Sequence, residues 1–521
     1  MDPASSASSS SSDASSTSEA ETTRGVVKAA SDADAGDGRD DFRARYDAVS
    51  DVPCRVTSIE LRGVERTRVE LIEREMERAR RAKTLDEIKD ALFAADARLR
   101  EYDIFKDVAM VIDADNASVF KNITGADDVP GAKVVVSVEE RDLLHARAGT
   151  FMSKRGEGEL EAAIGLRNAM GLGDKFTLEF TRGASSSSAY SAGYEQPRVL
   201  GSDVNLTTSL YQSLECFKKL SSFDVTSRGL TVGLTGDGPG TIDYTIEHRD
   251  VRDPTRLASR GVRKQLGESL KSAVTHTYVD DRLDRHVRPT TGYLWKVRSE
   301  LAGIGLLSNP MATKFAKSEF TTHAVRTLNA KRGITASLTG RLGVLLPFGK
   351  PGEDGAIETC IADRFFLGGV GCLRQFETSG AGPSDERRGE SRMGRPSDDD
   401  NASKEPALKR DALGGDFVWS VTGAVQMDVP GEKFEAMRDA GIHFHAFASA
   451  GTLLPLSALA GGAKDATKKI RDATRASVGI GIVWPLPIGQ IEINYGKVLR
   501  ATSIDRAKDG FHVGLAAHVN L

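Results

Sequence analysis

The feature that most constrains the fold of this chain is an alternation of apolar and polar side chains, with a period of two residues, from residue 175 onward. The segment KFTLEFTRG, residues 175–183, sets three apolar side chains against three polar ones, namely Phe176, Leu178 and Phe180 against Thr177, Glu179 and Thr181. The same alternation occurs in residues 241–248, 292–301, 333–346 and 510–521. Because successive side chains of a strand point to opposite faces, the pattern predicts strands with one apolar and one polar face.

Two architectures contain such strands. A soluble β-sandwich turns the apolar face inward, whereas a membrane β-barrel turns it outward to lipid. The alternation here extends over roughly 350 residues, whereas a sandwich takes about 100. Several segments are long enough to cross a bilayer at a tilt, and the chain ends on a strand, as a closed sheet requires. We therefore predict a mainly β chain with an antiparallel transmembrane barrel over residues 175–521.

Residues 53–141 follow a different pattern and predict a small α+β domain. Its expected order is β-α-α-β-β, with strands in residues 54–63, 106–115 and 133–141 and helices in residues 66–82 and 84–105. Thr84 is placed to cap the second helix.

The remaining segments are expected to lack regular structure. Residues 1–52 are rich in Ser and Ala and contain 11 acidic and 5 basic residues, which predicts a disordered tail and argues against a cleaved, arginine-rich presequence. Residues 142–174 are interpreted as a linker, and the charged residues 384–411 as a disordered insertion.

Composition and motifs argue against several function classes. The net charge of -4 gives no reason to expect nucleic-acid binding, and no apolar run is long enough for a transmembrane helix. Nucleotide-binding and nucleophile-elbow motifs are missing, and GLTGDGPGT lacks the lysine of a phosphate loop. We therefore predict no enzyme, no catalytic residues and no cofactor.

The possible metal ligands are few. Cys54, Cys216, Cys360 and Cys372 form no C-x-x-C pair, and a disulfide between the last two stays open as an alternative. His443 and His445 share one strand face, but no third ligand is near them in the sequence. We expect no metal site.

The segment DRFFLGGVGCLRQFETSGAGP, residues 363–383, places a lone arginine in an apolar, glycine-rich loop. It resembles the sixth extracellular loop of the outer-membrane β-barrel assembly (bacterial surface antigen) family, which has a V/I-R-G-F/Y motif. The matching motif residues are Leu373, Arg374, Gln375 and Phe376, and the matching residues before them are Arg364, Phe365, Gly368 and Gly369.

Three further segments strengthen this resemblance through their order and spacing, over residues 54–521. Residues 411–430 resemble the strand after the loop, residues 475–499 the penultimate strands, and residues 97–113 part of a POTRA (polypeptide-transport-associated) domain. Within the family, the single POTRA domain at residues 53–141 and the segments DALGG, residues 411–415, and INYG, residues 493–496, look most like the mitochondrial barrel subunit of the sorting and assembly machinery. The family implies sixteen antiparallel strands.

The resemblance implies that Arg374 packs against the inner wall of the barrel. Two departures affect this expectation. Gln375 stands at the glycine of the motif, which is expected to alter a tight turn. Gln426 and Ser449 stand where bacterial relatives have acidic wall residues, so neutral hydrogen bonds to Arg374 are expected in place of an ion pair.

The function implied is insertion of unfolded β-barrel precursors into the mitochondrial outer membrane. Its partners would be those precursors, accessory subunits of an assembly complex and membrane lipid, with the POTRA domain in the intermembrane space. The expected lateral gate joins the first and last strands, whose residues are Phe176, Thr177, Leu178, Glu179, Phe180 and Thr181 in one and Gly510, Phe511, Val513, Gly514 and Leu515 in the other.

Three alternatives compete with this function. A chloroplast outer-envelope relative, either an insertase or a translocation pore, would usually have more POTRA domains than the one visible here. A passive solute pore would need neither that domain nor an inward-folded arginine loop. A soluble enzyme would need one of the motifs that this chain lacks.

Overall fold

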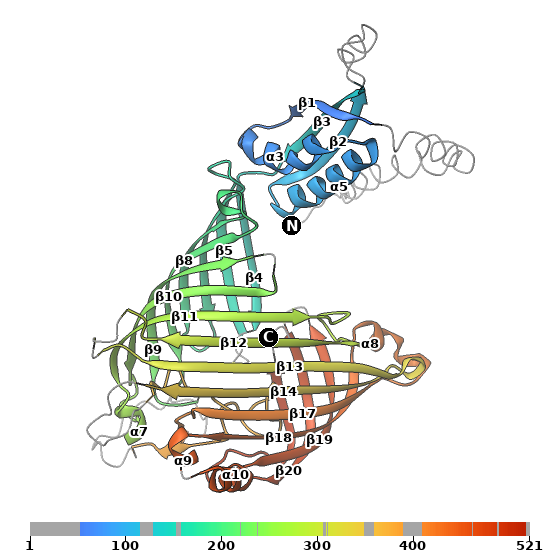
Figure 1. Cartoon of the computed structure of the whole chain (residues 1–521). Coiled ribbons are helices and arrows are strands. Elements are labelled where there is room, and N and C mark those ends of the chain that lie inside the picture. Colours follow the sequence, from blue (N-terminus) through green and yellow to red (C-terminus); the bar gives the residue numbers. More distant parts are fainter. Residues whose placement is uncertain are drawn as a thin grey trace, which may run out of the picture. The chain divides into compact units, whose positions relative to one another are not determined.

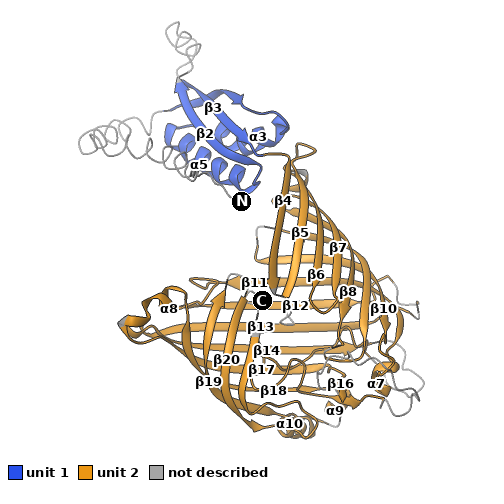
Figure 2. Ribbon diagram, turned by 180° about the vertical axis from the view of Figure 1, so that it is seen from behind, with its two compact units in different colours: residues 1–141 blue, residues 142–521 orange. Residues whose placement is uncertain are grey.

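The computed structural model in Figure 1 describes residues 53–516 except 115–128, 153–157, 219, 237, 306–308, 310, 349–358, 389–408, 461 and 487–488. The chain divides into two compact units, residues 1–141 and residues 142–521 (Figure 2). The predicted tail, residues 1–52, and most of the predicted insertion, residues 389–408, lie outside the described residues.

The first unit packs helices against a three-stranded sheet. Its elements are β1 (Arg55–Arg62), α3 (Val69–Glu75), α4 (Glu77–Arg81), α5 (Leu85–Glu101), β2 (Phe105–Ala114) and β3 (Gly131–Glu140). The sheet order is β1-β3-β2, with β1 parallel and β2 antiparallel to β3. The structure has the predicted order of elements, with the first predicted helix divided at Met76.

Helix α5 shows why this unit folds as the sequence predicts. The Thr84 side chain accepts a hydrogen bond from the Glu87 amide at 3.2 Å and caps the first turn. Its buried face consists of Ile88, Leu92, Ala95 and Leu99, which pack in one core with the buried valines of β3. None of the helices in the described residues is long and apolar enough to span a membrane.

The carboxylate of Glu140, at the end of β3, holds the turn that follows β1. Its Oε1 atom accepts from the amides of Glu65, Arg66 and Thr67 at 3.1, 3.1 and 2.9 Å and from Thr67 Oγ1 at 2.7 Å. Burial opposes the charge, but these hydrogen bonds outweigh it and lower the pKa of Glu140 to about 2. Because the folded pKa lies below the usual 4.5, the stabilisation is complete above that value and is lost as the pH falls toward 2.

We expect Glu140→Gln to loosen this turn, because a neutral amide accepts these bonds more weakly and adds a donor where only donors point. The amides of Arg66 and Thr67 should exchange about tenfold faster at pH 7, the effect of about 1.4 kcal/mol of lost hydrogen bonding. Hydrogen exchange of the full chain measures this. The matched control is Glu139→Gln, since the Glu139 side chain is exposed. Unchanged exchange at Arg66 and Thr67 would contradict the role given to Glu140.

The second unit contains one large antiparallel sheet whose strand order follows the chain. The sheet curls along its length (Figure 1). Its sixteen strands are β4 (Leu144–Met152), β5 (Gly158–Arg167), β6 (Lys175–Gly183), β7 (Ser188–Gln196), β8 (Asn205–Cys216), β9 (Asp224–Thr235), β10 (Gly240–Arg252), β11 (Gly267–Asp281), β12 (Gly292–Ala302), β13 (Phe315–Asn329), β14 (Ile334–Pro347), β17 (Phe417–Asp428), β18 (His443–Leu454), β19 (Arg475–Leu486), β20 (Gly489–Arg500) and β21 (Gly510–Ala516). The predicted number of strands and their antiparallel pairing are confirmed.

Short elements lie in the connections between these strands. They are the hairpin of β15 (Ser384–Glu386) and β16 (Arg410–Ala412), the helices α7 (Arg260–Arg263), α8 (Glu435–Asp439), α9 (Leu456–Leu459) and α10 (Ala463–Asp472), and the 3-10 turns η1 (Val199–Gly201), η2 (Ala330–Arg332) and η4 (Glu432–Phe434). The hairpin corrects the predicted bounds of the disordered insertion, residues 384–411. Both ends of that segment, residues 384–388 and 409–411, have a described structure.

The polarity of the two faces of the sheet is the reverse of that in a soluble protein. Large apolar side chains are exposed on its outer face, with Leu178 65% and Ile480 62% accessible. Polar side chains on the other face are buried, and they include Thr275, Glu300, Thr321, Ser420 and Glu492. An apolar outer face and a polar inner face are typical of a barrel in a membrane and exclude the soluble sandwich.

The predicted linker at residues 142–174 is wrong, because β4 and β5 lie within it and are the first two strands of the sheet. Outward-facing and inward-facing residues do alternate along β4 and β5. However, β4 contains Ala146, Ala148 and Gly149, which give little apolar signal. The predicted first strand, residues 176–181, is therefore part of β6, the third strand. The edge strands of the sheet are β4 and β21, and no pairing between them occurs in the described residues.

Candidate functional site

The connection from β14 to β17, residues 348–416, is the sixth at its end of the sheet, and we call it the sixth loop. Five of its apolar side chains are buried in one cluster with wall residues of β11 to β14, β17 and β18. The loop members of this cluster are Phe365, Leu367, Leu373, Phe376 and Ala381. The sixth loop therefore folds back against the inner face of the sheet, as the resemblance implied.

The two glycines after the first apolar residues allow this compact fold. Gly368 and Gly369 have φ values of 120° and 101°, in the region that side chains disfavour. A Cβ at Gly368 would lie 2.4 Å from the Glu377 carbonyl oxygen, so the two arms of the loop approach too closely for any other residue.

Arg374 lies inside the sheet and forms a two-pronged ion pair with Glu492 on β20. Its Nε donates to Glu492 Oε2 and its Nη2 to Oε1, each at 2.8 Å. The guanidinium also lies over the Phe447 ring, 5.3 Å from its centroid, and Ser477 Oγ donates to the Arg374 carbonyl at 2.6 Å. The Glu492 side chain is fully buried, so this pair is the strongest single attachment of the loop tip to the wall.

The expected neutral partners of Arg374 are therefore wrong. Gln426 bonds weakly to Thr335, and Ser449 accepts from Thr422 at 3.0 Å, so neither hydrogen-bonds to Arg374. The acidic partner comes from β20, three strands beyond β17. A signal for it existed in the segment QIEINYG, where Glu492 and Asn494 alternate with apolar residues and so face the inner side.

Glu492 belongs to a polar network on the inner face. Gln490 Nε2 donates to its Oε1 at 2.8 Å and Asn494 Nδ2 to its Oε2 at 3.0 Å. His445 Nε2 in turn lies 2.6 Å from Asn494 Oδ1. Every member is partnered, so the carboxylate is held in place to receive the arginine.

A second attachment, which the sequence did not reveal, lies at the start of the same loop. Asp363 Oδ1 accepts from Arg249 Nη1 on β10 at 2.7 Å, and Lys317 Nζ on β13 donates to the Asp363 carbonyl at 2.7 Å. Arg364, which was predicted in the stretch before the motif, instead ties the loop to itself through Thr359 and Leu413. The loop thus pairs its Asp363 with a basic part of the wall and its Arg374 with an acidic part.

Gln375 has a left-handed backbone conformation of the kind that favours glycine. Its φ is 66°, in the left-handed region, and its side chain is completely buried. The turn is therefore formed with a glutamine, and the side chain points to β20 and β21, where it has contacts that a glycine lacks.

The last strand has its predicted position at one edge of the sheet. Phe511 and Val513 point outward, 78% and 64% accessible, whereas Gly514 faces Val370 of the sixth loop. Gly510 has a φ of 90° and begins the strand. The structure does not describe the side chain of Leu515. These residues lie on the edge strand β21, and the other edge strand is β4, whereas the predicted residues of β6 lie on the third strand of the sheet.

No site for metal chemistry is present in the part of the chain that the structure describes, because no three His, Cys, Asp or Glu side chains come together there. His443 and His445 are buried and bond to the Gly441 carbonyl and to Asn494. The four cysteines are free, so Cys360 and Cys372 are not joined.

Comparison with known proteins gives a consistent result. The Omp85 superfamily domain matches residues 168–517. A SAM50-like protein of Schizosaccharomyces pombe is 26% identical over 475 residues, covering 89% of this chain and 90% of the relative. The sorting and assembly machinery component 50 homolog of Bos taurus is 29% identical over 475 residues, covering 88% and 89%.

A solved structure shows the same fold. BamA from Haemophilus ducreyi lacking POTRA domains 1-3 superposes with a TM-score of 0.68 at 17% identity, over 89% of this chain and 84% of that one. Residues 142–521 alone could not supply this coverage, so the match also includes part of the first unit.

Proposed function

This chain belongs to the Omp85 superfamily, and from that premise we propose that it inserts and assembles β-barrel precursors in the mitochondrial outer membrane. The observation that carries the proposal is the seam: in the described residues, the sixteen-stranded sheet ends in two strands, β4 and β21, that are not paired with each other. The names of the curated relatives, which refer to a sorting and assembly machinery, support the same function.

The mechanism follows from the cost of unpaired backbone groups in lipid. Each N–H or C=O of a precursor strand that enters the membrane without a partner costs several kcal/mol. The free edge of β4 or β21 offers a row of complementary groups, so a precursor strand can pair there as it enters. The gate expected from the sequence is thus reassigned from β6 and β21 to β4 and β21.

The first unit is proposed to be a POTRA domain facing the intermembrane space. Its order of strands and helices supports this, and the match to the BamA structure extends into this unit. Strand β4 begins at the opposite end of the sheet from the sixth loop, which supports placing that loop on the cytosolic side. Accessory subunits of an assembly complex and membrane lipid are the further proposed partners.

Depletion of the protein from its own cells tests this function. Isolated mitochondria should then assemble imported barrel precursors more slowly, scored by protease-resistant, heat-modifiable barrel, because the template edge is lost. A precursor anchored by a single helix should insert as before and serves as the control. Normal barrel assembly in depleted mitochondria would refute the proposal, and a defect found only in chloroplasts would favour the envelope insertase or translocation pore.

A further inference from the structure

The start of the last strand is attached to the sixth loop by backbone hydrogen bonds. Loop residues 375–377 run antiparallel beside residues 506–508, which precede β21, with Phe376 opposite Ala507. The Lys508 amide donates to the Gln375 carbonyl at 2.9 Å, and the Glu377 amide donates to the Arg506 carbonyl at 3.0 Å. A short ladder therefore joins the loop to the chain entering the final strand.

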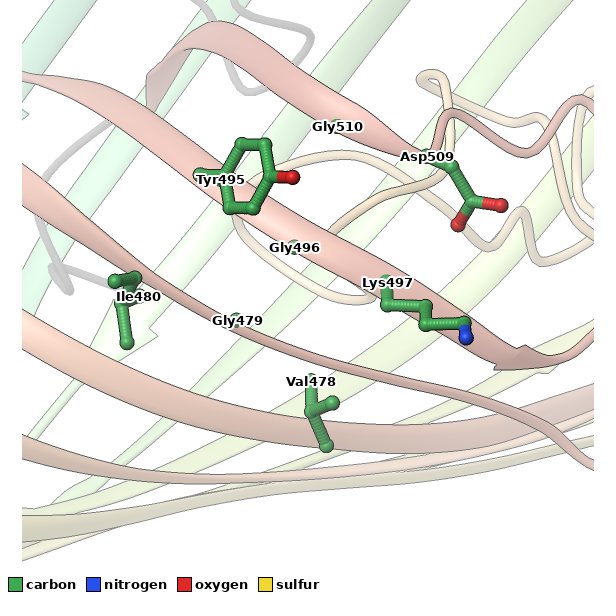
Figure 3. Close-up of a pocket in the computed structure, with 8 residues that line it drawn as sticks. All are labelled: Val478, Gly479, Ile480, Tyr495, Gly496, Lys497, Asp509 and Gly510. Carbon is green, nitrogen blue, oxygen red and sulfur yellow. The ribbon is translucent and has the colours of Figure 1, made fainter.

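A row of glycines brings the loop within reach of the wall at this point. Gly479, Gly496 and Gly510 lie opposite one another on β19, β20 and β21 (Figure 3). A Cβ at Gly496 would lie 2.4 Å from the Gln375 side-chain amide. Because there is no side chain at Gly496, the amide of Gln375 reaches the backbone of the sheet itself.

The Gln375 amide bridges the two strands at the end of their ladder. In the orientation that satisfies both of its ends, Nε2 donates to the Lys508 carbonyl at 2.7 Å and Oε1 accepts from the Gly496 amide at 2.8 Å. A backbone peptide group placed between β20 and the chain entering β21 would donate and accept the same two hydrogen bonds. The side chain thus extends the pairing of the last two strands by one position.

Charges reinforce the same end of β21. Glu377 lies 3.4 Å from Arg506 and 3.2 Å from Lys508, and Arg475 pairs with the buried Asp505 at 3.0 Å in the same turn. The opposite half of the strand, beyond Phe511, has its ladder to β20 and the contact of Gly514 with Val370. In the part of the last strand that the structure describes, attachment to the sixth loop is therefore concentrated at the start.

We propose that Gln375 is a positioning residue that clasps the start of β21 to β20, so that the described strand, Gly510–Ala516, loosens first at its Ala516 end. Gly510, with its φ of 90°, is the pivot next to the clasp. The meaning of this opening for precursor insertion rests on the proposed function, but the clasp itself is a property of this chain and is testable without a precursor.

Hydrogen exchange of the full chain in nanodiscs tests the clasp, with Gln375→Gly as the main variant. Glycine keeps the left-handed backbone without strain and removes the whole side chain, including the bridging amide. The Gly496 amide and residues 508–512 should exchange about tenfold faster than in the unchanged protein, while β17 and β18 stay as they were. The faster exchange of the C-terminal half of β21 relative to its start should disappear.

Two further variants make the result specific. Gln375→Glu keeps the acceptor for Gly496 but sets a buried carboxylate oxygen against the Lys508 carbonyl, so exchange should be at least as fast as in Gln375→Gly. Ser379→Gly is the matched control, because Ser379 has a φ of 53° in the same loop and its side chain takes no part in the clasp. Equal exchange in Gln375→Gly and the unchanged protein, or equal acceleration in Ser379→Gly, would overturn the proposal.

Precursor insertion provides the second readout. If the seam opens at the clasped strand, Gln375→Gly should change the insertion rate along with the exchange of β21. If Gln375→Gly alters exchange but not the insertion rate, the clasp does not control the gate. The proposed insertion function would then still stand, by another route. If neither the unchanged protein nor any variant inserts a precursor, the proposed function is refuted and the clasp is not.

Discussion

Arg374→Ala is expected to slow precursor insertion strongly while the sheet itself still assembles. The substitution leaves the fully buried Glu492 without its cation, and breaking a buried pair by removing one partner costs about 3–5 kcal/mol. The loop tip would then leave the wall, although Asp363 still holds its start. Insertion kinetics into isolated membranes and protease sensitivity of the loop measure the two effects.

Conservative and compensating variants separate the charge from the fit. Arg374→Lys should restore insertion only in part, because lysine lacks the planar fork that grips both oxygens of Glu492. The double variant Arg374→Met with Glu492→Gln should be more stable than Arg374→Met alone, since no buried charge is left unpaired. Arg471→Ala, on the exposed surface of α10, is the matched arginine control. Insertion at the normal rate in Arg374→Ala would show that the attachment of the loop tip is not needed.

Locking β4 to β21 with a disulfide is expected to abolish insertion, and a reductant should restore it. A sheet without a free edge has no template, and only these two strands lack a sequential neighbour on one side in the described residues. Cysteines introduced along residues 144–152 and 510–514 would be screened in pairs, in a background that lacks the four native cysteines. The readout is insertion of a radiolabelled precursor before and after reduction.

The matched control locks two strands in the middle of the sheet. Val297 on β12 lies directly opposite Phe320 on β13, so a disulfide there adds a bond to an existing ladder and should leave insertion unchanged. Single cysteines in β4 should also crosslink to the C-terminal strand of a stalled precursor, and cysteines in β21 to its N-terminal strand. Cysteines at residues 176–181 of β6 should not. Normal insertion by the locked protein, or equal crosslinking from β6, would rule out this seam.

Much of the architecture was determined by local patterns in the sequence. A two-residue period is present in any strand that separates an apolar from a polar face, so a large antiparallel sheet was predictable from segments such as residues 175–183. The number of sixteen strands came from the family resemblance. The order of the first unit was predictable for the same reason, because Thr84 and the apolar face of α5 mark a helix locally. Strands β4 and β5 were missed where alanine and glycine weaken that contrast.

The arginine loop marks the limit of such reasoning. The family resemblance implied that Arg374 faces inward, but every polar residue on an inner face is an equal candidate for its partner. Which one it meets depends on how far the loop reaches across the sheet, and only the folded structure brings Glu492, 118 positions later, to its guanidinium. The contacts of Asp363 and Gln375 likewise became known only from the folded structure. The period of the side chains is a property of each strand, whereas the contacts of a returning loop depend on the curvature and register of strands distant in sequence, so these contacts were set by the tertiary structure alone.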